Sequence, residues 1–332
     1  MDVKRNRTRI LFIWAVLSFG ACSGFETYRG EAAGILPAPA SAYQSVDAPF
    51  SIRMLALSDI HGYDRKTLVL NEAVQRRHMF FWGKTQDTSF EKTRRILESA
   101  GRQQGIDFVV IAGDLTVDGE EASHRLLSEI LSDFELTGIP VFVTTGNHDV
   151  NNPYASKHGK HLTVPVTNVG PSAFAEIYAE FGFSEAIARD AVTLSYAAEP
   201  QPGILLLMLD TSRWDENRGF PFPRSVEGGA VRADTLEWAE RVLSSARDAG
   251  KTIIAVQHHP LDDAADLYDL YRRFGVALSV SGHRHLFGEA LEDPVPRVAA
   301  PSIAASETNP LLIELDRDGI RVARNPFRFV DR

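Results

Sequence analysis

The chain has 332 residues, of which 44% are hydrophobic and 24% are charged, which is typical of a globular protein with a sizeable core. Its formal net charge of −9 at neutral pH provides no overall basic field that would attract nucleic acid, so we expect no nucleic acid partner. An anionic small-molecule substrate would need a local source of positive charge, which a pair of divalent cations would supply.

Residues 1–21 are predicted to be a signal peptide of the lipoprotein type. Four basic residues precede the apolar run ILFIWAVLSFGA, which is too short to span a bilayer comfortably. Cys22 follows Gly20-Ala21, a pattern similar to bacterial lipoprotein signals, in which the cysteine is lipidated and becomes the mature N-terminus. Ordinary secretion and an uncleaved N-terminal anchor are the alternatives. Each of these three interpretations predicts export, and the lipoprotein interpretation also predicts membrane attachment through the lipid on Cys22.

Residues 22–50 contain Pro37 and Pro39 among Ala, Gly and Ser, and we expect a flexible tether. Cys22 is the single cysteine of the chain. The mature protein would therefore have no disulfide framework, and any transition-metal site would be built from His, Asp, Glu or Asn.

From residue 52 onwards, short apolar runs alternate with amphipathic stretches. Six of these runs predict buried strands because they are rich in Leu or β-branched residues and are flanked by polar residues or Gly. They are IRMLAL (52–57), FVVIA (108–112), VFVTT (141–145), ILLLML (204–209), TIIAV (252–256) and VALSV (276–280).

Three capping-box patterns predict helices between these strands. They open at Thr88, Asp118 and Asp234, each with Glu three residues later, and the helices end near residues 104, 136 and 250. The alternation of strands and helices predicts an α/β fold with largely parallel strands.

Two segments depart from this alternation. Residues 150–203 begin as a polar, irregular stretch and continue as AFAEIYAEFGF, which looks helical; we expect a cap-like insertion facing the substrate. Near the C-terminus, two alternating runs flank Asp318-Gly319, which predicts a β-hairpin.

Five of the six predicted strands are followed directly by potential metal ligands. The motifs are SDIHG, GDL, GNHD, QHHP and GHRH, and they contain Asp59, His61, Asp114, Asn147, His148, Asp149, His258, His259, His283 and His285. Because the carboxyl ends of parallel strands form the ligand-binding edge of an α/β sheet, we expect these motifs to converge in one pocket.

Two divalent ions about 3.5–4 Å apart can clamp a phosphoryl group and generate a nucleophile from water. Such a pair needs one bridging anionic oxygen and several terminal ligands. We expect Asp59 and His61 to point the same way because strand side chains alternate with period two, and the same holds for His283 and His285. Glycine in GD, GN and GH would let the backbone pack closely around the ions.

The ordered set D-x-H, GD, GNHD, H and GHxH resembles the calcineurin-like metallophosphoesterase superfamily. Within it, GDLTVDGEEASH, GNHDVNNPYA, PSAFAEIYAEFGF, LMLDTSRW and VEGG resemble secreted bacterial cyclic-nucleotide phosphodiesterases of class III. The resemblance covers residues 52–290. It implies a four-layer α/β/β/α sandwich, with two mixed sheets flanked by helices, over residues 51–332.

The resemblance also implies the roles of the site residues. The first ion would be held by Asp59, His61 and His285, the second by Asn147, His258 and His283, with Asp114 bridging them. His148 would be the catalytic residue that acts on the phosphate. The ions would be Mn, Fe or Zn, with Mn as the first expectation.

The implied reaction is in-line attack of a metal-bound hydroxide on a phosphoester, and the substrate suggested by the subgroup is a cyclic nucleotide. The alternatives are a phosphomonoesterase or nucleotidase acting on extracellular phosphate esters, and a non-catalytic metal- or nucleotide-binding surface lipoprotein. No protein partner is implied.

The sequence leaves two alternative roles for several residues near these motifs. Asp149 either orients His148 or holds the turn, and His259 either lines the pocket or supports a ligand. Arg284 is expected to point away from the ions. The segment His78–Trp82 either closes the core or stacks a nucleobase.

Overall fold

The computed structural model describes residues 51–81, 88–103, 105–219, 221–305, 310–324 and 326–327. The signal peptide, Cys22 and the tether predicted from the sequence lie outside the described residues. They stay predictions.

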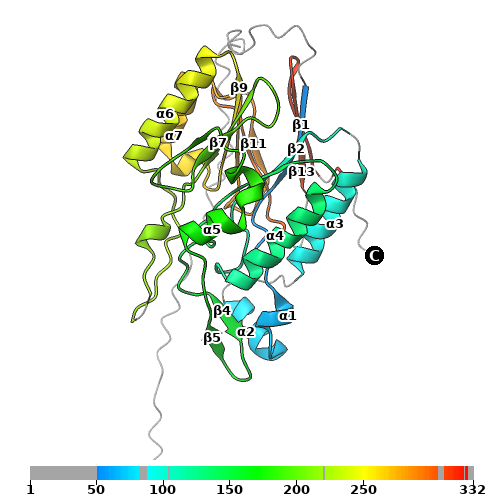
Figure 1. Cartoon of the computed structure of the whole chain (residues 1–332), viewed down its shortest axis with the longest axis vertical. Helices are drawn as coiled ribbons and strands as arrows, with labels where there is room; N and C mark the ends of the chain where they lie inside the picture. The colour runs from blue at the N-terminus through cyan, green and yellow to red at the C-terminus, as the bar shows by residue number, and fades with distance from the viewer. Residues whose placement is uncertain are drawn as a thin grey trace, which may run out of the picture. The chain divides into compact units, whose positions relative to one another are not determined.

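Two mixed β-sheets form the centre of the domain (Figure 1). The first sheet contains, in spatial order, β14 (Gly319–Arg324), β13 (Leu311–Asp316), β1 (Ser51–Leu57), β2 (Phe108–Ala112) and β3 (Val141–Thr144). The second contains β11 (Gly288–Ala290), β12 (Arg297–Ala299), β10 (Leu278–Ser281), β9 (Thr252–Gln257), β8 (Ile204–Leu209), β7 (Tyr196–Ala198) and β6 (Ala188–Arg189). In the first sheet β1, β2 and β3 are parallel, while β13 and β14 add antiparallel strands on one side. In the second sheet the four strands β12, β10, β9 and β8 are parallel, and antiparallel strands flank them on both sides.

Helices cover the outer faces of the two sheets. α3 (Ser89–Arg102) and α4 (Glu121–Glu135) pack on the first sheet, while α6 (Ala233–Asp248) and α7 (Ala265–Phe274) pack on the second (Figure 1). One buried cluster joins both sheets with α3 and α4, and another joins the second sheet with α6 and α7. The predicted α/β/β/α sandwich is confirmed.

All six apolar runs are strands, within two residues of the predicted bounds, and nearly every residue in them is buried. The predicted C-terminal hairpin is also confirmed. β13 pairs antiparallel with β14, and the register brings Asp316 opposite Gly319, whose φ of 129° lies in the region that favours glycine.

The three predicted helices exist, but the capping boxes predicted to open them are wrong. Thr88 precedes α3 without a side-chain hydrogen bond, α4 begins after Glu120, and α6 begins after Arg232. Asp118 lies before the N-cap of α4, and its carboxylate Oδ1 is 3.2 Å from Nδ1 of His148 in the loop after β3.

Part of the predicted insertion belongs to the body of the domain. β6 and β7 extend the second sheet, and α5 (Pro171–Ile177) leads into a π-helical turn at Ala179–Phe183, whose Phe181 is buried in the core. The stretch predicted as one helix is therefore interrupted, with non-helical φ and ψ at Phe181 and Gly182.

The rest of the insertion contains a small hairpin, β4 (Ser156–His158) and β5 (Thr163–Pro165), beside α1 (Arg65–Leu68) and α2 (Glu72–Phe81) (Figure 1). Its function as a cap stays a prediction. In α2, Met79 is buried and Phe80 is exposed, whereas Trp82 lies outside the described residues. No helix in the described ranges is long and apolar enough to cross a membrane.

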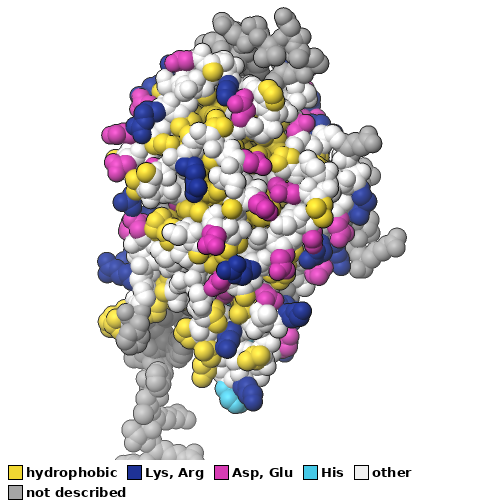
Figure 2. All heavy atoms as spheres, in the orientation of Figure 1, with side chains coloured by type: hydrophobic (Ala, Val, Ile, Leu, Met, Phe, Trp, Pro, Cys, Tyr) yellow, Lys and Arg dark blue, Asp and Glu magenta, His cyan; other side chains and the backbone are white. Residues whose placement is uncertain are grey.

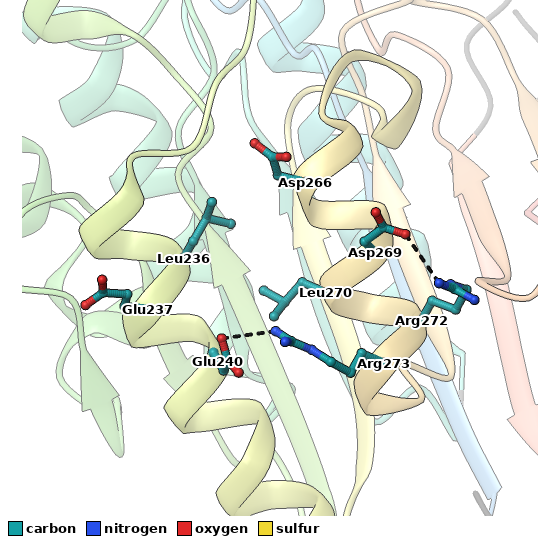
Figure 3. Close-up of a pocket in the computed structure, with 8 residues that line it drawn as sticks. All are labelled: Leu236, Glu237, Glu240, Asp266, Asp269, Leu270, Arg272 and Arg273. Carbon is teal, nitrogen blue, oxygen red and sulfur yellow. Dashed lines mark ion pairs between the residues drawn. The ribbon is translucent and has the colours of Figure 1, made fainter.

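A cavity of about 710 Å³ lies between α6 and α7 (Figure 3). Leu236 and Leu270 form its apolar part. Its two arginines are paired with acidic neighbours, Arg272 with Asp269 and Arg273 with Glu240. Glu237 and Asp266 also line the cavity, so its lining has more acidic than basic side chains.

His124 of α4 is a buried neutral histidine that links the loops after β2 and β3. Its Nε2–H donates to the carbonyl of Asp149 at 3.0 Å, and its Nδ1 accepts from the hydroxyl of Tyr178 at 2.9 Å. Burial lowers the pKa of His124 to about 3, against 6.5 for an unperturbed histidine.

This depressed pKa predicts a loss of stability in acid. Between pH 6.5 and about 3 the unfolded chain binds one proton more than the folded chain at this site, so the free energy of unfolding falls as the pH falls. Between pH 7 and pH 5.5, His124 should account for a loss of ~1 kcal/mol. In His124→Gln, whose amide can make both hydrogen bonds, this part of the loss should disappear. Urea unfolding of metal-free wild type and of metal-free His124→Gln, each at pH 7 and pH 5.5, measures this difference. Equal losses of unfolding free energy in the two proteins would contradict the role given to His124.

Candidate metal centre

The seven predicted ligands converge at the carboxyl ends of β1, β2, β3, β9 and β10, where the two sheets face each other. The predicted set was Asp59, His61, Asp114, Asn147, His258, His283 and His285, and each one lies within 4 Å of another member. Ligand atoms of Asp59, His61, Asp114 and His285 all lie within 4.8 Å of one another. Convergence of strand ends from both sheets therefore places the predicted ligands together, while their individual roles stay predictions.

Asp114 lies at the centre of this cluster and is almost completely buried. Its Oδ2 is 3.3 Å from Nε2 of His258 in the second sheet and 3.6 Å from Nε2 of His61 in the first. Its Oδ1 accepts a hydrogen bond from the backbone N–H of His148 at 3.0 Å. One carboxylate oxygen thus faces imidazoles from both sheets, which fits the predicted bridge between two ions.

The first ligand group surrounds Asp59. Its Oδ1 lies 3.2 Å from Nε2 of His285 and 3.9 Å from Nε2 of His61. These two imidazole nitrogens are 3.1 Å apart, and the buried Oδ1 accepts no well-aligned hydrogen bond. Two imidazoles and an unsatisfied carboxylate oxygen that meet at one point form a donor set suited to a divalent cation.

The second ligand group surrounds the amide oxygen of Asn147. This Oδ1 lies 3.1 Å from Nε2 of His258 and 3.2 Å from Nδ1 of His283. His258 donates its Nδ1–H to the carbonyl of Ala112 at 2.9 Å, which turns Nε2 towards the centre of the site. Asn147 donates from Nδ2 to Oε2 of Glu227 at 3.3 Å, so Glu227 orients the amide with its oxygen inward.

The electrostatics of the cluster favour bound cations. Burial acts to raise the pKa of Asp114, but His258 and His148 outweigh it and hold that pKa well below its ordinary value. Conversely, burial opposes a charge on His258, yet Asp114 raises the pKa of this imidazole to about 10. Buried carboxylates that are this strongly ionised require positive charge, which two divalent ions would provide.

The backbone at the ligands is strained. Six non-glycine residues in the described ranges have a positive φ, and five of them are predicted ligands: Asp59 (50°), His61 (44°), Asp114 (51°), His283 (70°) and His285 (59°). A left-handed conformation costs ~1–2 kcal/mol for such residues. Strain concentrated at these positions indicates a functional constraint on them.

The expectation that strand alternation orients Asp59, His61, His283 and His285 is wrong. Asp59 and His61 lie beyond β1, which ends at Leu57, and His283 and His285 lie beyond β10. Left-handed turns therefore direct these side chains into the site, and strand alternation does not.

The predicted role of glycine is confirmed at two positions. A Cβ on Gly146 would lie 2.1 Å from Oδ1 of Asp114, and one on Gly282 would lie 2.6 Å from Oδ2 of Asp59. Both distances are far below van der Waals contact, so these positions exclude any side chain.

His148 lies beside the cluster, with its ring centroid 5.0 Å from that of His61. Its Nδ1 is 3.2 Å from Oδ1 of Asp118, and Asn152 donates from Nδ2 to the carbonyl of His148 at 3.2 Å. Asp118 is a site residue that sequence reasoning missed, because its spacing to Glu121 indicated a helix cap.

The structure distinguishes between the two predicted roles of Asp149. Its Oδ1 accepts from the backbone N–H groups of Leu115 and Thr116 at 2.9 and 3.0 Å, and its Oδ2 accepts from Gly146 at 2.8 Å. Asp149 therefore ties the loops after β2 and β3 together, while Asp118 contacts His148.

His259 is a neighbour of the ligands. One of its ring nitrogens lies within 4.8 Å of a ring nitrogen of His258 and of His283, but both nitrogens of His259 have other partners. Nδ1 lies 2.8 Å from the hydroxyl of Thr211, and Nε2 donates to the carbonyl of Glu227 at 2.9 Å. His259 thus supports the loop that carries Glu227.

Arg284 points away from the cluster, as expected. It forms ion pairs with Asp262 at 3.1 Å and Asp263 at 3.4 Å.

Comparison with known proteins agrees with this geometry. The family model described as calcineurin-like phosphoesterase matches residues 52–287. Sphingomyelin phosphodiesterase 2 of Caenorhabditis elegans is 25% identical over 203 residues, which cover 54% of this chain and 31% of that protein. The chain thus spans about a third of this curated relative.

Solved structures show the same fold. A dimetal phosphatase from Danio rerio superposes with a TM-score of 0.56 and 13% identity, covering 83% of this chain and 96% of that chain. A purple acid phosphatase from yellow lupin (Lupinus luteus) superposes with a TM-score of 0.51 and 12% identity, covering 86% of this chain and 53% of that chain.

The two ligand groups predict selective loss of single ions. His285→Ala should weaken the ion near Asp59 by at least ~10²-fold, while His283→Ala should weaken the ion near Asn147 by a similar factor. Metal content per chain after dialysis should fall from two ions to about one in each single variant and to none in the double variant. A double variant that retains as much metal as either single variant would show that both histidines hold the same ion.

Proposed function

The chain belongs to the calcineurin-like phosphoesterase family, and on this basis we propose that its substrate is a phosphodiester, specifically a cyclic nucleotide. The chain is a metal-dependent phosphoester hydrolase by family and by fold. The choice of a cyclic nucleotide is supported by the sequence motifs that resemble class III phosphodiesterases.

The observation that carries the proposal is the position of Asp114 between the two ligand groups. Two divalent ions bound there would neutralise phosphoryl oxygens and make a water molecule acidic at neutral pH. Nitrogen and oxygen ligands without thiolate admit Mn, Fe and Zn, and we propose Mn as the first candidate.

We assign to His148 the protonation of the leaving group, a step that the metal ligands do not perform. Its Nδ1 faces the carboxylate of Asp118, which fixes the ring orientation. This leaves Nε2 as the polar atom that contacts substrate. We assign His148 the transfer of a proton from Nε2 to the leaving alkoxide oxygen, and Asp118 the orientation of the ring.

A phospholipid diester is the second candidate substrate. It is favoured by the similarity to a protein named as a sphingomyelin phosphodiesterase, which is the relative at 25% identity. Both candidates are diesters, so the diester preference does not depend on the choice between them.

We also propose that the protein is exported and anchored to a membrane through a lipid on Cys22. This part of the proposal is supported by the basic and apolar pattern of residues 1–21 and by the small residues before Cys22.

A substrate panel tests the proposed reaction. With Mn²⁺, the protein should hydrolyse an aryl phosphodiester and at least one of the 2′,3′- and 3′,5′-cyclic nucleotides faster than the corresponding 5′-monophosphates. A sphingomyelin arm distinguishes the phospholipid alternative. Faster hydrolysis of monophosphates than of every diester would identify a phosphomonoesterase. Lack of turnover with Mn, Fe and Zn would favour a non-catalytic binding protein.

The assignment of His148 predicts that binding and turnover can be separated. His148→Ala should retain two ions per chain and reduce kcat by at least ~10²-fold, because it removes the proton donor but no metal ligand. Asp118→Asn should retain the ions and lower kcat by a smaller factor than His148→Ala, because the carboxylate that orients the imidazole is lost. Loss of metal from His148→Ala, measured by elemental analysis, would place His148 among the ligands.

A further inference from the structure

One end of the domain is cationic although the chain as a whole is acidic. Residues 65–81 and 154–168 contain six Lys or Arg and one acidic residue, Glu72. Within them, Lys66, Arg76, Arg77 and Lys160 are exposed, and Lys157 is half-buried. We refer to these five side chains as the basic end.

The five side chains of the basic end lie on neighbouring elements, α1, α2 and the β4–β5 hairpin (Figure 1). The backbone N–H groups of Leu70 and Asn71 donate to the carbonyl of His158 at 2.8 and 3.1 Å. The side chain of Asn71 donates to the carbonyl of Lys160 at 3.0 Å. These bonds fix the tip of the hairpin against the start of α2.

Among the described residues, the five side chains of the basic end form a group of unpaired cations. Several exposed arginines of other helices lie in ion pairs, such as Arg125 with Glu121 and Arg273 with Glu240, although Arg95 and Arg241 form none with a described residue. Across the part of the chain that the structure describes, Arg65 is paired with Glu72, whereas the five side chains of the basic end are in no ion pair. Their charge is therefore available to an anionic partner.

Exposed apolar side chains lie among these cations. They are Leu70 (63% exposed), Phe80 (77%), Leu162 (61%) and Val164 (37%). Phe80 follows Arg76 and Arg77 by about one helical turn, and Lys157 lies directly opposite Val164 in the β4–β5 register. At the lower tip of Figure 2, yellow, dark blue and cyan side chains lie together.

We propose that the basic end docks on the surface of an anionic lipid bilayer. Cationic side chains attract acidic head groups, and exposed Leu, Val and Phe side chains enter the boundary between head groups and acyl chains. A nucleic acid would use the cations but would gain nothing from aliphatic side chains. The combination of both side-chain types therefore favours a bilayer.

Docking in this way would bring the candidate metal centre close to the membrane. α1 begins four residues after His61, and the segment before β4 contacts His148 through Asn152. The proposal concerns binding alone and does not depend on the chemistry of the metal site.

Vesicle cosedimentation of the full chain tests the proposal. Wild-type protein should bind vesicles of phosphatidylcholine with roughly one third phosphatidylglycerol more tightly than vesicles of phosphatidylcholine alone. Each Lys or Arg near an anionic surface is worth about fivefold in affinity, so Arg76→Glu/Arg77→Glu should lose at least ~25-fold. Residues 1–50 are identical in every protein compared, so the difference reports on the basic end.

The matched control is Arg272→Glu/Arg273→Glu, which makes the same change in net charge on a pair of neighbouring arginines in α7. It should stay within about threefold of wild type, because charges far from the membrane are screened by salt. Equal losses in the two double variants, or no preference of wild type for anionic vesicles, would overturn the proposal. Circular dichroism melting confirms that each variant is folded.

Insertion of apolar side chains is tested separately by tryptophan fluorescence. Leu162→Trp should show a blue shift with anionic vesicles, whereas Leu136→Trp, at an exposed position at the end of α4, should show none. A Leu162→Trp emission that is unchanged by vesicles would reject the bilayer. If RNA then displaces the protein from anionic vesicles, the basic end is a polyanion-binding face.

Discussion

The site depends on the burial of two carboxylates, Asp59 and Asp114, where the two sheets face each other. An isolated buried carboxylate costs several kcal/mol, so this arrangement is stable only with positive charge beside it. The second sheet brings His258 to Asp114, and the loop after β10 brings His285 to Asp59. The metal centre therefore forms only when the two sheets pack together, because each carboxylate needs an imidazole from the second sheet beside it.

The loops hold this arrangement against strain. The residues after β1 run alongside those after β2, with the N–H groups of Asp59 and His61 donating to the carbonyls of Gly113 and Asp114 at 3.0 and 2.9 Å. The carboxylate of Asp149 accepts three backbone N–H groups from the loops after β2 and β3. These hydrogen bonds offset the left-handed conformations at the ligands and hold the donor atoms in place.

Much of this could be predicted from the sequence, because apolar runs mark the strands and the ligands follow directly at their ends. The convergence of Asp59 and Asp114 follows from neighbouring parallel strands of the first sheet that end at one edge. The approach of His258 also requires the second sheet to face the first. Asp118 and Glu227 could not be found in this way. Each acts through a contact between loops, to His148 and Asn147, that has no characteristic sequence spacing. The same holds for the basic end, which combines two segments far apart in sequence.

The central claim is that Asp114 is shared by two metal ions held from opposite sheets. Anomalous X-ray diffraction from crystals of the Mn²⁺-loaded protein tests it most directly. We predict two anomalous peaks about 3.5–4 Å apart, with a carboxylate oxygen of Asp114 between them. A single peak, or a second ion bound by His259 and not by Asn147, would contradict the account.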